Sequence, residues 1–85
     1  MEIVFTETAI KDLKFWKMSG NKIIQQRIEQ LIKSIIESPF EGIGKPEALK
    51  YNYSGYWSRR INEEHRMVYS VSDGVLTIVQ LRDHY

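Results

Sequence analysis

Residues 56–82, with the sequence YWSRRINEEHRMVYSVSDGVLTIVQLR, decide the fold of this 85-residue chain. The stretch contains three runs rich in β-branched and aromatic residues, at 56–62, 66–72 and 75–82, and such runs are typical of β-strands. Asp73-Gly74 separates the last two runs and is a strong signal for a tight hairpin turn. The sequence therefore predicts a meander of three strands.

The loop between the first two strands decides which arginines lie together. Strand side chains alternate between the two faces of a sheet, so Arg59 and Arg60 point to opposite faces. A two-residue loop, Glu63-Glu64, would align Arg59 with Arg66. A three-residue loop that also includes His65 would align Arg60 with Arg66, and it groups apolar side chains on one face: Trp57, Ile61, Met67, Tyr69 and Val71. We therefore expect the second register, with His65 as a turn residue.

The N-terminal part of the chain predicts a strand and a helix. Residues 2–6, EIVFT, have the alternation of a short strand, and Thr6 or Thr8 can cap the helix that follows. The apolar side of this helix includes Trp16, which we expect in the core together with Trp57. Gly20-Asn21 ends the helix.

The segment 22–37 gives the clearest helical pattern. Apolar residues recur there at spacings of four, three and four: Ile24, Ile28, Leu31 and Ile35. The helix ends near Ser38, because Pro39 disfavours helical geometry in the residue before it. Two helices followed by a strand meander predict an α+β fold, and a chain of this length predicts one domain, residues 1–85.

Residues 39–55 form a segment that we expect to be irregular. Two prolines and three glycines punctuate it: Pro39, Gly42, Gly44, Pro46 and Gly55. A loop of this length is unusual in so small a domain, and long ordered loops often carry function. We therefore expect functional residues in this segment.

Composition excludes several classes of function. The chain has no cysteine, so disulfides, thiolate zinc sites and cysteine nucleophiles are excluded, which fits a protein of the reducing cytoplasm. Charged residues near the N-terminus leave no apolar run for a signal peptide or a membrane span. His65, His84 and the scattered carboxylates lack metal-ligand spacing, so we expect no metal site and no cofactor. A small domain offers only a shallow groove, which suits a macromolecular substrate.

Charge is distributed unevenly, although the net charge is only +1. Within residues 45–60, Glu47 is the single acid opposite four basic residues: Lys45, Lys50, Arg59 and Arg60. This local excess can contact phosphates, and it can equally be a solvated charged face.

RNA cleavage without a metal needs a base for the attacking 2′-OH, an acid for the departing 5′ oxygen and a cation for the phosphoryl oxygens. Glu47 is a candidate base, although an ordinary solvated loop carboxylate explains it as well. Arg66 is a candidate cation with a fork suited to phosphate, and the alternative is a surface salt bridge with Glu63 or Glu64.

The last two residues, His84 and Tyr85, complete the set of candidates. Histidine is the natural acid near neutral pH, and a tyrosine ring can stack on an unpaired RNA base. Termini usually fray, and these residues can be an incidental polar tail. Here they follow a strand directly, which favours an ordered position.

Several motifs give the chain a family resemblance. They are PFEG at 39–42, GKPE at 44–47, LK at 49–50, SGYWSRRI at 54–61, EEHRMVYSV at 63–71 and HY at 84–85. In these motifs, and in the order and length of its elements, the whole chain resembles the YoeB branch of the RelE/ParE toxin superfamily. The resemblance implies a RelE-like fold, in which an N-terminal strand and two helices pack on a twisted antiparallel sheet.

The resemblance also implies a function and partners. Toxins of this branch enter the bacterial ribosome and cleave mRNA in the A site, and a YefM-like antitoxin neutralises them. They are often homodimers, and the toxin–antitoxin complex binds operator DNA to repress its own operon.

By position, the resemblance implies three catalytic residues: Glu47 as general base, His84 as general acid and Arg66 as the group that stabilises the phosphate. It also implies four residues that bind or arrange the substrate. Lys50 and Arg60 would bind phosphate, Tyr85 would stack on the substrate, and Glu64 would help to orient the arginines. Asp83 departs from the family pattern, in which an aromatic or other uncharged residue precedes the terminal pair.

Two other interpretations of the sequence remain. One is a non-catalytic inhibitor on the same fold, like the ParE toxins that act on DNA gyrase, and such a protein would not need Glu47, Arg66 and His84. The other is a plain RNA-binding module, which the weak net charge disfavours.

Overall fold

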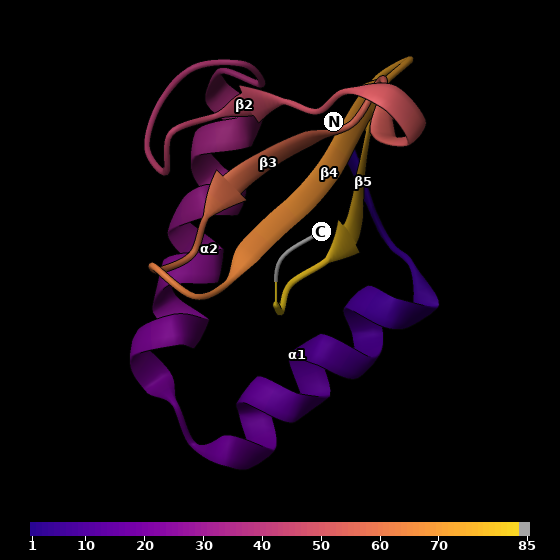
Figure 1. Ribbon diagram of the computed structural model, residues 1–85. Coiled ribbons are helices and arrows are strands. Elements are labelled where there is room, and N and C mark those ends of the chain that lie inside the picture. Colours follow the sequence, from indigo (N-terminus) through magenta and orange to yellow (C-terminus); the bar gives the residue numbers. More distant parts are fainter. Residues whose placement is uncertain (84–85) are drawn as a thin grey trace.

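A computed structural model describes residues 1–83 of the chain, so the predictions for His84 and Tyr85 lie outside the described residues. Within residues 1–83 the fold is one five-stranded sheet with two α-helices (Figure 1). The strand order is β1-β5-β4-β3-β2. The strands are β1 (Glu2–Phe5), β2 (Glu47–Ala48), β3 (Trp57–Arg60), β4 (Arg66–Ser72) and β5 (Val75–Gln80).

Strands β2 to β5 are antiparallel, and β1 pairs in parallel with β5. The sheet is therefore mixed, where we expected it to be antiparallel with the N-terminal strand among the elements packed on it. The reason is topological. The chain leaves β1 into the helices and comes back to that edge only in β5, and parallel neighbours need such a long crossover.

Both helices begin at side-chain caps that the sequence contains. Helix α1 (Glu7–Ser19) starts at Thr6, not Thr8, because the Thr6 hydroxyl accepts a hydrogen bond from the amide of Ala9 at 3.1 Å. Helix α2 (Lys22–Glu37) starts at Asn21, which caps the amide of Ile24 at 3.1 Å. The two predicted helices are confirmed.

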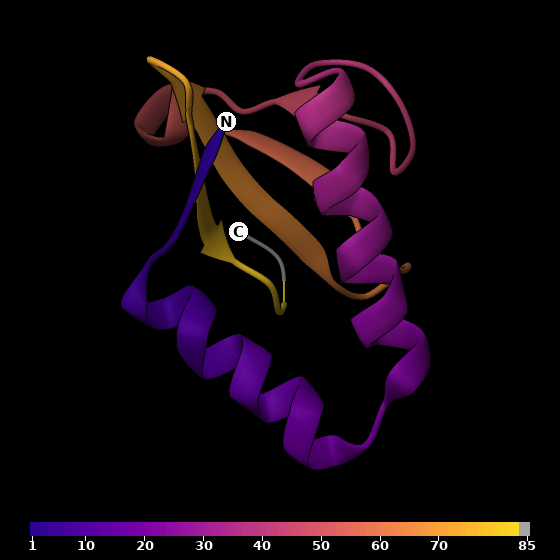
Figure 2. The same cartoon turned by 180° about the vertical axis from the view of Figure 1, so that it is seen from behind.

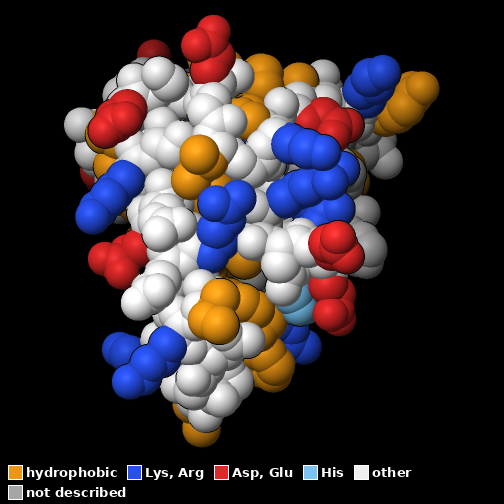
Figure 3. All heavy atoms as spheres, turned by 90° about the vertical axis from the view of Figure 1, so that its left-hand side faces the viewer, with side chains coloured by type: hydrophobic (Ala, Val, Ile, Leu, Met, Phe, Trp, Pro, Cys, Tyr) orange, Lys and Arg blue, Asp and Glu red, His pale blue; other side chains and the backbone are white. Residues whose placement is uncertain are grey.

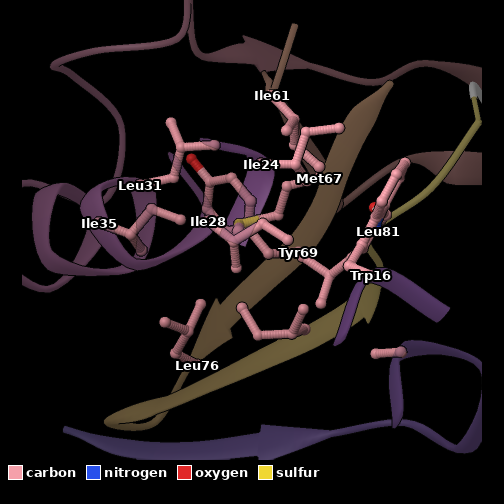
Figure 4. Close-up of a cluster of buried hydrophobic side chains, with 12 residues drawn as sticks. Trp16, Ile24, Ile28, Leu31, Ile35, Ile61, Met67, Tyr69, Leu76 and Leu81 are labelled. Atoms are coloured by element: carbon pink, nitrogen blue, oxygen red, sulfur yellow. The ribbon is translucent and has the colours of Figure 1, made fainter. Parts of the chain in front are cut away.

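The core lies between α2 and one face of the sheet. Figure 2 shows α2 in front of the strands, with α1 across the lower end of the molecule. In Figure 4, Leu31 and Ile35 of α2 lie around the ring of Tyr69 from β4, and all three residues are fully buried. Each such side chain contributes roughly 1.5–3 kcal/mol on leaving water. Trp16 belongs to the same cluster, and Trp57 packs against it half-buried.

The meander places Arg60 opposite Arg66, which confirms that these two arginines share a face. The expected loop of Glu63 to His65 is wrong in its bounds, because the Ile61 amide already bonds the His65 carbonyl at 3.0 Å, so residues 62–64 make the turn. Strand β4 has the expected bounds, while β3 and β5 are shorter than expected.

The segment 39–55 is not wholly irregular, because it contains β2 and a 3₁₀ turn, η1 (Tyr51–Tyr53). Strand β2 forms because β3 offers a free edge, on which Glu47 pairs with Ser58. None of the helices in residues 1–83 is long and apolar enough to cross a membrane.

Candidate active site

The outer face of the sheet, opposite the helices, collects three of the candidate residues. Residues paired across antiparallel strands project their side chains on the same face. Trp57 and Tyr69 pair on the core face, so Arg60 and Arg66, which lie an odd number of residues away, pair on the outer face. The same alternation puts Glu47 on the outer face, opposite Ser58. The sheet therefore presents a carboxylate and two guanidinium groups together.

Basic side chains are concentrated near this outer face of the sheet. Figure 3 views the molecule from the side that carries α2 and β2, and it shows Lys and Arg side chains gathered in one patch with Asp and Glu side chains beside it. Arg60 and Lys50 are exposed, while Arg66 is partly buried. A mixed surface of this kind can bind phosphate groups locally without attracting RNA over a long range.

Arg66 is held by backbone carbonyls. Its Nη1 donates to the carbonyl oxygens of Asn62 at 2.8 Å, Glu63 at 3.2 Å and His65 at 3.2 Å. Within residues 1–83, Nε and Nη2 of Arg66 make no hydrogen bond and no carboxylate pairs with this guanidinium. The predicted alternative, a surface salt bridge with Glu63 or Glu64, is therefore wrong. Among residues 1–83, the side chain is therefore held through Nη1 alone.

The C-terminal segment runs beside Arg66. The Arg66 amide donates to the carbonyl of Asp83 at 2.9 Å, and the Asp83 amide donates to Nδ1 of His65 at 2.8 Å. Asp83 has a φ of +62°, in the left-handed region. Its carboxylate lies 3.8 Å from Nε of Arg82, so the acid that departs from the family pattern has a basic neighbour. The chain therefore passes Arg66 immediately before it reaches residue 84.

Glu47 lies at the rim of an open hollow. Residues 47–53 line this hollow of about 440 Å³. The ring of Tyr51 is almost fully exposed there, and its backbone has a φ of +58°. Glu47 and Lys50 are both exposed, so the structure leaves both side chains accessible to a ligand.

Glu64 contacts a different partner from the one expected. Its carboxylate lies 3.9 Å from Nε2 of His65, and within residues 1–83 it makes no ion pair with an arginine. Any influence of Glu64 on Arg66 must therefore pass through the loop that carries both residues.

Arg59 does not belong to the phosphate-binding set, although its charge suggested it. Its side chain is fully buried on the core face. The guanidinium donates five hydrogen bonds of 2.7–3.1 Å, to Tyr69 Oη, Ser34 Oγ and the carbonyls of Ile43, Ser38 and Glu41. The group ties the loop after α2 to β3. The alternation signals this role, because Arg59 falls between Trp57 and Ile61 on the apolar face.

Two further residues have structural environments that the sequence did not reveal. His65 closes the turn as expected, but it is also buried and packs edge-on against Trp16, with ring centroids 4.8 Å apart. Burial raises the pKa of Tyr69 above its usual value, and the hydrogen bond and the charge of Arg59 partly offset this rise.

In the part of the chain that the structure describes, no three His, Cys, Asp or Glu residues are grouped to hold a metal ion.

Comparison with known structures first identifies the fold. The fold is that of the RelE-like toxins. A YafQ structure from Escherichia coli superposes with a TM-score of 0.81 over 98% of this chain and 92% of that chain at 16% identity, a likeness that establishes the fold alone.

Sequence comparison then defines the family. A family model described as a YoeB-like toxin of bacterial type II toxin–antitoxin systems matches residues 5–85. A toxin YoeB from Synechocystis is 53% identical over 100% of this chain and 98% of its own length. The structure of a YoeB/ParE toxin from Agrobacterium tumefaciens has a TM-score of 0.96 and 42% identity over the whole of both chains. The chain belongs to the YoeB-like toxin family, as its motifs indicated.

Solved structures of this family include a dimer and a toxin–antitoxin complex. A YoeB dimer from Staphylococcus aureus has a TM-score of 0.91 and 44% identity, over 100% of this chain and 98% of that chain. A heterotetrameric YoeB–YefM toxin–antitoxin complex from the same species has a TM-score of 0.90, with the same identity and coverage.

Proposed function

We propose that this toxin is a ribosome-dependent endoribonuclease that cleaves mRNA in the ribosomal A site and so inhibits translation. One observation carries the proposal. Arg60 and Arg66 pair on the outer face that also carries Glu47, and the chain passes Arg66 directly before His84. A carboxylate and two guanidinium groups on one face, followed in the chain by a histidine, are the kinds of group that metal-free cleavage of RNA requires.

The reaction follows from these groups. Glu47 accepts the proton of the 2′-OH, whose oxygen attacks the adjacent phosphorus in line. Arg66, through the donors that its backbone contacts leave unused, stabilises the charge on the phosphoryl oxygens. The P–O5′ bond breaks as His84 gives its proton to the leaving 5′ oxygen. The products are a 2′,3′-cyclic phosphate and a free 5′-OH.

The remaining residues bind or arrange the substrate. Arg60 and Lys50 are exposed and contact phosphates on either side of the reacting one. Tyr85 stacks on a base. Glu64 acts on the arginines indirectly, since its carboxylate neighbours His65 on the loop whose carbonyls hold Arg66. No metal ion or cofactor takes part.

The partners follow from the family. The complexes of the S. aureus relatives support a YefM-like antitoxin as the neutralising partner, and the dimer supports homodimers. Operator DNA is bound only by the toxin–antitoxin complex. The ribosome places the activity in the cytoplasm, with no role for a membrane.

Primer extension on mRNA of translating ribosomes tests the proposal. The wild type should produce stops within A-site codons. Glu47→Ala, Arg66→Ala and His84→Ala should each lower the cleavage rate by at least about 10²-fold. Glu63→Ala is the matched control. It removes an exposed acidic side chain that has no proposed role, from the loop before Arg66, and the variant should cleave like the wild type.

Substitution of the scissile ribose by 2′-deoxyribose should abolish cleavage, because the attacking oxygen is gone. Cleavage of that substrate, or full activity of both the Glu47 and the His84 variant, would overturn the mechanism. Inhibition of gyrase supercoiling without any RNA cleavage would instead support the ParE-like function.

A further inference from the structure

We propose that His65 is a positioning residue that fixes the chain immediately before the terminal His84-Tyr85 pair. The inference rests on the proposed function, because it concerns how the acid His84 is presented to the substrate. We call the contacts that anchor Leu81 and Asp83 the C-terminal latch.

The first half of the latch holds Asp83. Nδ1 of His65 accepts the Asp83 amide hydrogen at 2.8 Å, and the next residue, Arg66, donates its amide to the Asp83 carbonyl at 2.9 Å. Both backbone polar groups of Asp83 are therefore bound by two consecutive residues at the start of β4. One of these residues, Arg66, is the proposed phosphate ligand. The latch therefore ties Asp83 directly to the residue that would bind the phosphate.

The second half holds Leu81 through side chains of α1. The Leu81 amide donates to Oδ2 of Asp12 at 2.9 Å, and its carbonyl accepts from Nε1 of Trp16 at 2.8 Å. Leu81 is fully buried. The Trp16 ring packs edge-on against His65, so it links the two anchored points.

The direction of the His65 hydrogen bond specifies one tautomer. Nδ1 can accept a hydrogen only through its lone pair, so the ring proton must be on Nε2, on the side of the Glu64 carboxylate. The latch thus gives four hydrogen bonds to the backbone of Leu81 and Asp83, and Nε2 of Gln80 donates a fifth to the Arg82 carbonyl between them at 3.1 Å. They also maintain a left-handed φ of +62° at Asp83, a conformation that costs free energy for any residue other than glycine.

The consequence of this anchoring is a fixed point of departure for residue 84. Displacement of a catalytic group by about 1 Å can cost about 10²-fold in rate. His65 can therefore control cleavage through geometry, without itself touching the RNA.

Two substitutions at the same position separate this role from simple packing. His65→Asn carries an amide oxygen near the place of Nδ1, so it can still accept the Asp83 amide hydrogen. His65→Leu fills the buried space with no acceptor. Cleavage is measured on ribosomes at steady state, at a temperature where both variants are folded. His65→Leu should lower kcat by about 10–10²-fold, with KM changed less than about twofold. His65→Asn should recover most of the rate.

Amide hydrogen exchange gives a readout that does not depend on cleavage. The Asp83 amide should exchange at least about tenfold faster in His65→Leu than in the wild type, while core amides of β4 keep their protection. In a His84→Ala background, His65→Leu should cause no further loss of rate, because a residue that acts through His84 has nothing left to position.

Opposite results overturn the proposal. They are an unchanged Asp83 exchange rate, wild-type kcat in His65→Leu while His84→Ala is impaired, or an equal loss of rate from His65→Leu in both backgrounds. Full activity of His84→Ala would instead refute the proposed acid, and the exchange experiment alone would then decide whether the latch exists.

Discussion

Arg59 and Arg60 are consecutive residues of β3 whose side chains lie on opposite faces of the sheet. Arg59 is a buried cation without a carboxylate partner in residues 1–83, and carbonyl and hydroxyl dipoles compensate its charge. A buried charge is tolerated only when it is hydrogen-bonded throughout. Arg60 is exposed and available to a ligand. One Arg-Arg dipeptide thus contributes one side chain to the core and one to the face that carries the candidate site.

Substitution of each arginine by methionine should separate stability from activity. Arg59→Met removes a charged donor from each of three backbone carbonyls and should lower the free energy of unfolding by about 3–5 kcal/mol. Arg60→Met should change it by less than about 0.5 kcal/mol and should still impair cleavage. Urea denaturation of both variants checks the contrast, which fails if the two curves shift equally.

The hydroxyl of Tyr69 joins the same buried network. It accepts from Nε of Arg59 at 3.1 Å and donates to the carbonyl of Pro39 at 2.7 Å. Because burial raises the pKa of Tyr69 in the folded state, the folded protein holds this proton more tightly than the unfolded chain. The resulting stability is complete below the unfolded pKa of about 10 and is lost as the pH rises through the folded pKa.

Tyr69→Phe should therefore lower stability near pH 8 by about 1–2 kcal/mol, since it removes two hydrogen bonds of a buried hydroxyl. The difference from the wild type should shrink above pH 10, because the wild type alone then loses the contribution of this proton. Urea denaturation at pH 8 and near pH 11 measures both differences. A difference that stays constant with pH would show that Tyr69 does not titrate differently in the two states.

At the scale of elements, the loop that follows α2 depends on a close approach of backbone. Gly44 has a φ of +84°, its carbonyl accepts from the Arg60 amide at 2.6 Å, and it lies against Leu31 of α2. A Cβ atom at this position would come within 2.7 Å of Leu31 Cδ2. The approach fixes the segment that leads directly into β2 and Glu47.

Gly44→Ala should therefore destabilise the protein by about 2–4 kcal/mol, as the sum of left-handed strain and overpacking. Gly20→Ala is the control, because Gly20 has a similar φ of +72° and nothing within 4 Å of its added Cβ. The control should cost only about 1–2 kcal/mol. If thermal unfolding shows the same loss of stability for both variants, the core adjusts its packing around the extra methyl group.

How far the elements could be predicted depends on how local their causes are. The pattern from Ile24 to Ile35 and the Asp73-Gly74 turn are local signals, and both were confirmed. The β2 strand carries no local signal, because only the free edge of β3 induces it. The parallel pairing of β1 likewise arises from chain topology.

The residues of the candidate site likewise fall into those that local signals predicted and those that depend on distant contacts. Alternation and an odd number of turn residues placed Arg60 on the face of Arg66, although the turn lies one residue earlier than expected. The same alternation implied that Arg59 is buried, yet its charge drew it into the phosphate-binding set. The contact of His65 with Asp83 could not be predicted from the sequence, because the two residues are 18 positions apart in the chain.

The whole molecule offers little to hold RNA unaided. It has 85 residues, a net charge of +1 and an open hollow in place of a deep cleft. Non-specific affinity for nucleic acid comes from phosphates neutralised by basic residues, and few such residues are gathered on the outer face. Orientation of the reacting groups supplies much of the rate in a reaction of this kind. Under the proposed function, the ribosome supplies this orientation by holding the mRNA stationary against Glu47 and Arg66.

The same RNA sequence should therefore be cleaved at least about 10³-fold more slowly when free than when it occupies the ribosomal A site. Single-turnover rates at equal toxin concentration measure this ratio, with Arg66→Ala as the background in both settings. Raising the salt concentration from 50 to 200 mM should weaken binding of the free oligonucleotide only modestly, since few counterions are displaced. Comparable rates on free and ribosome-bound RNA would mean that the toxin orients its substrate alone, through contacts beyond the exposed outer face.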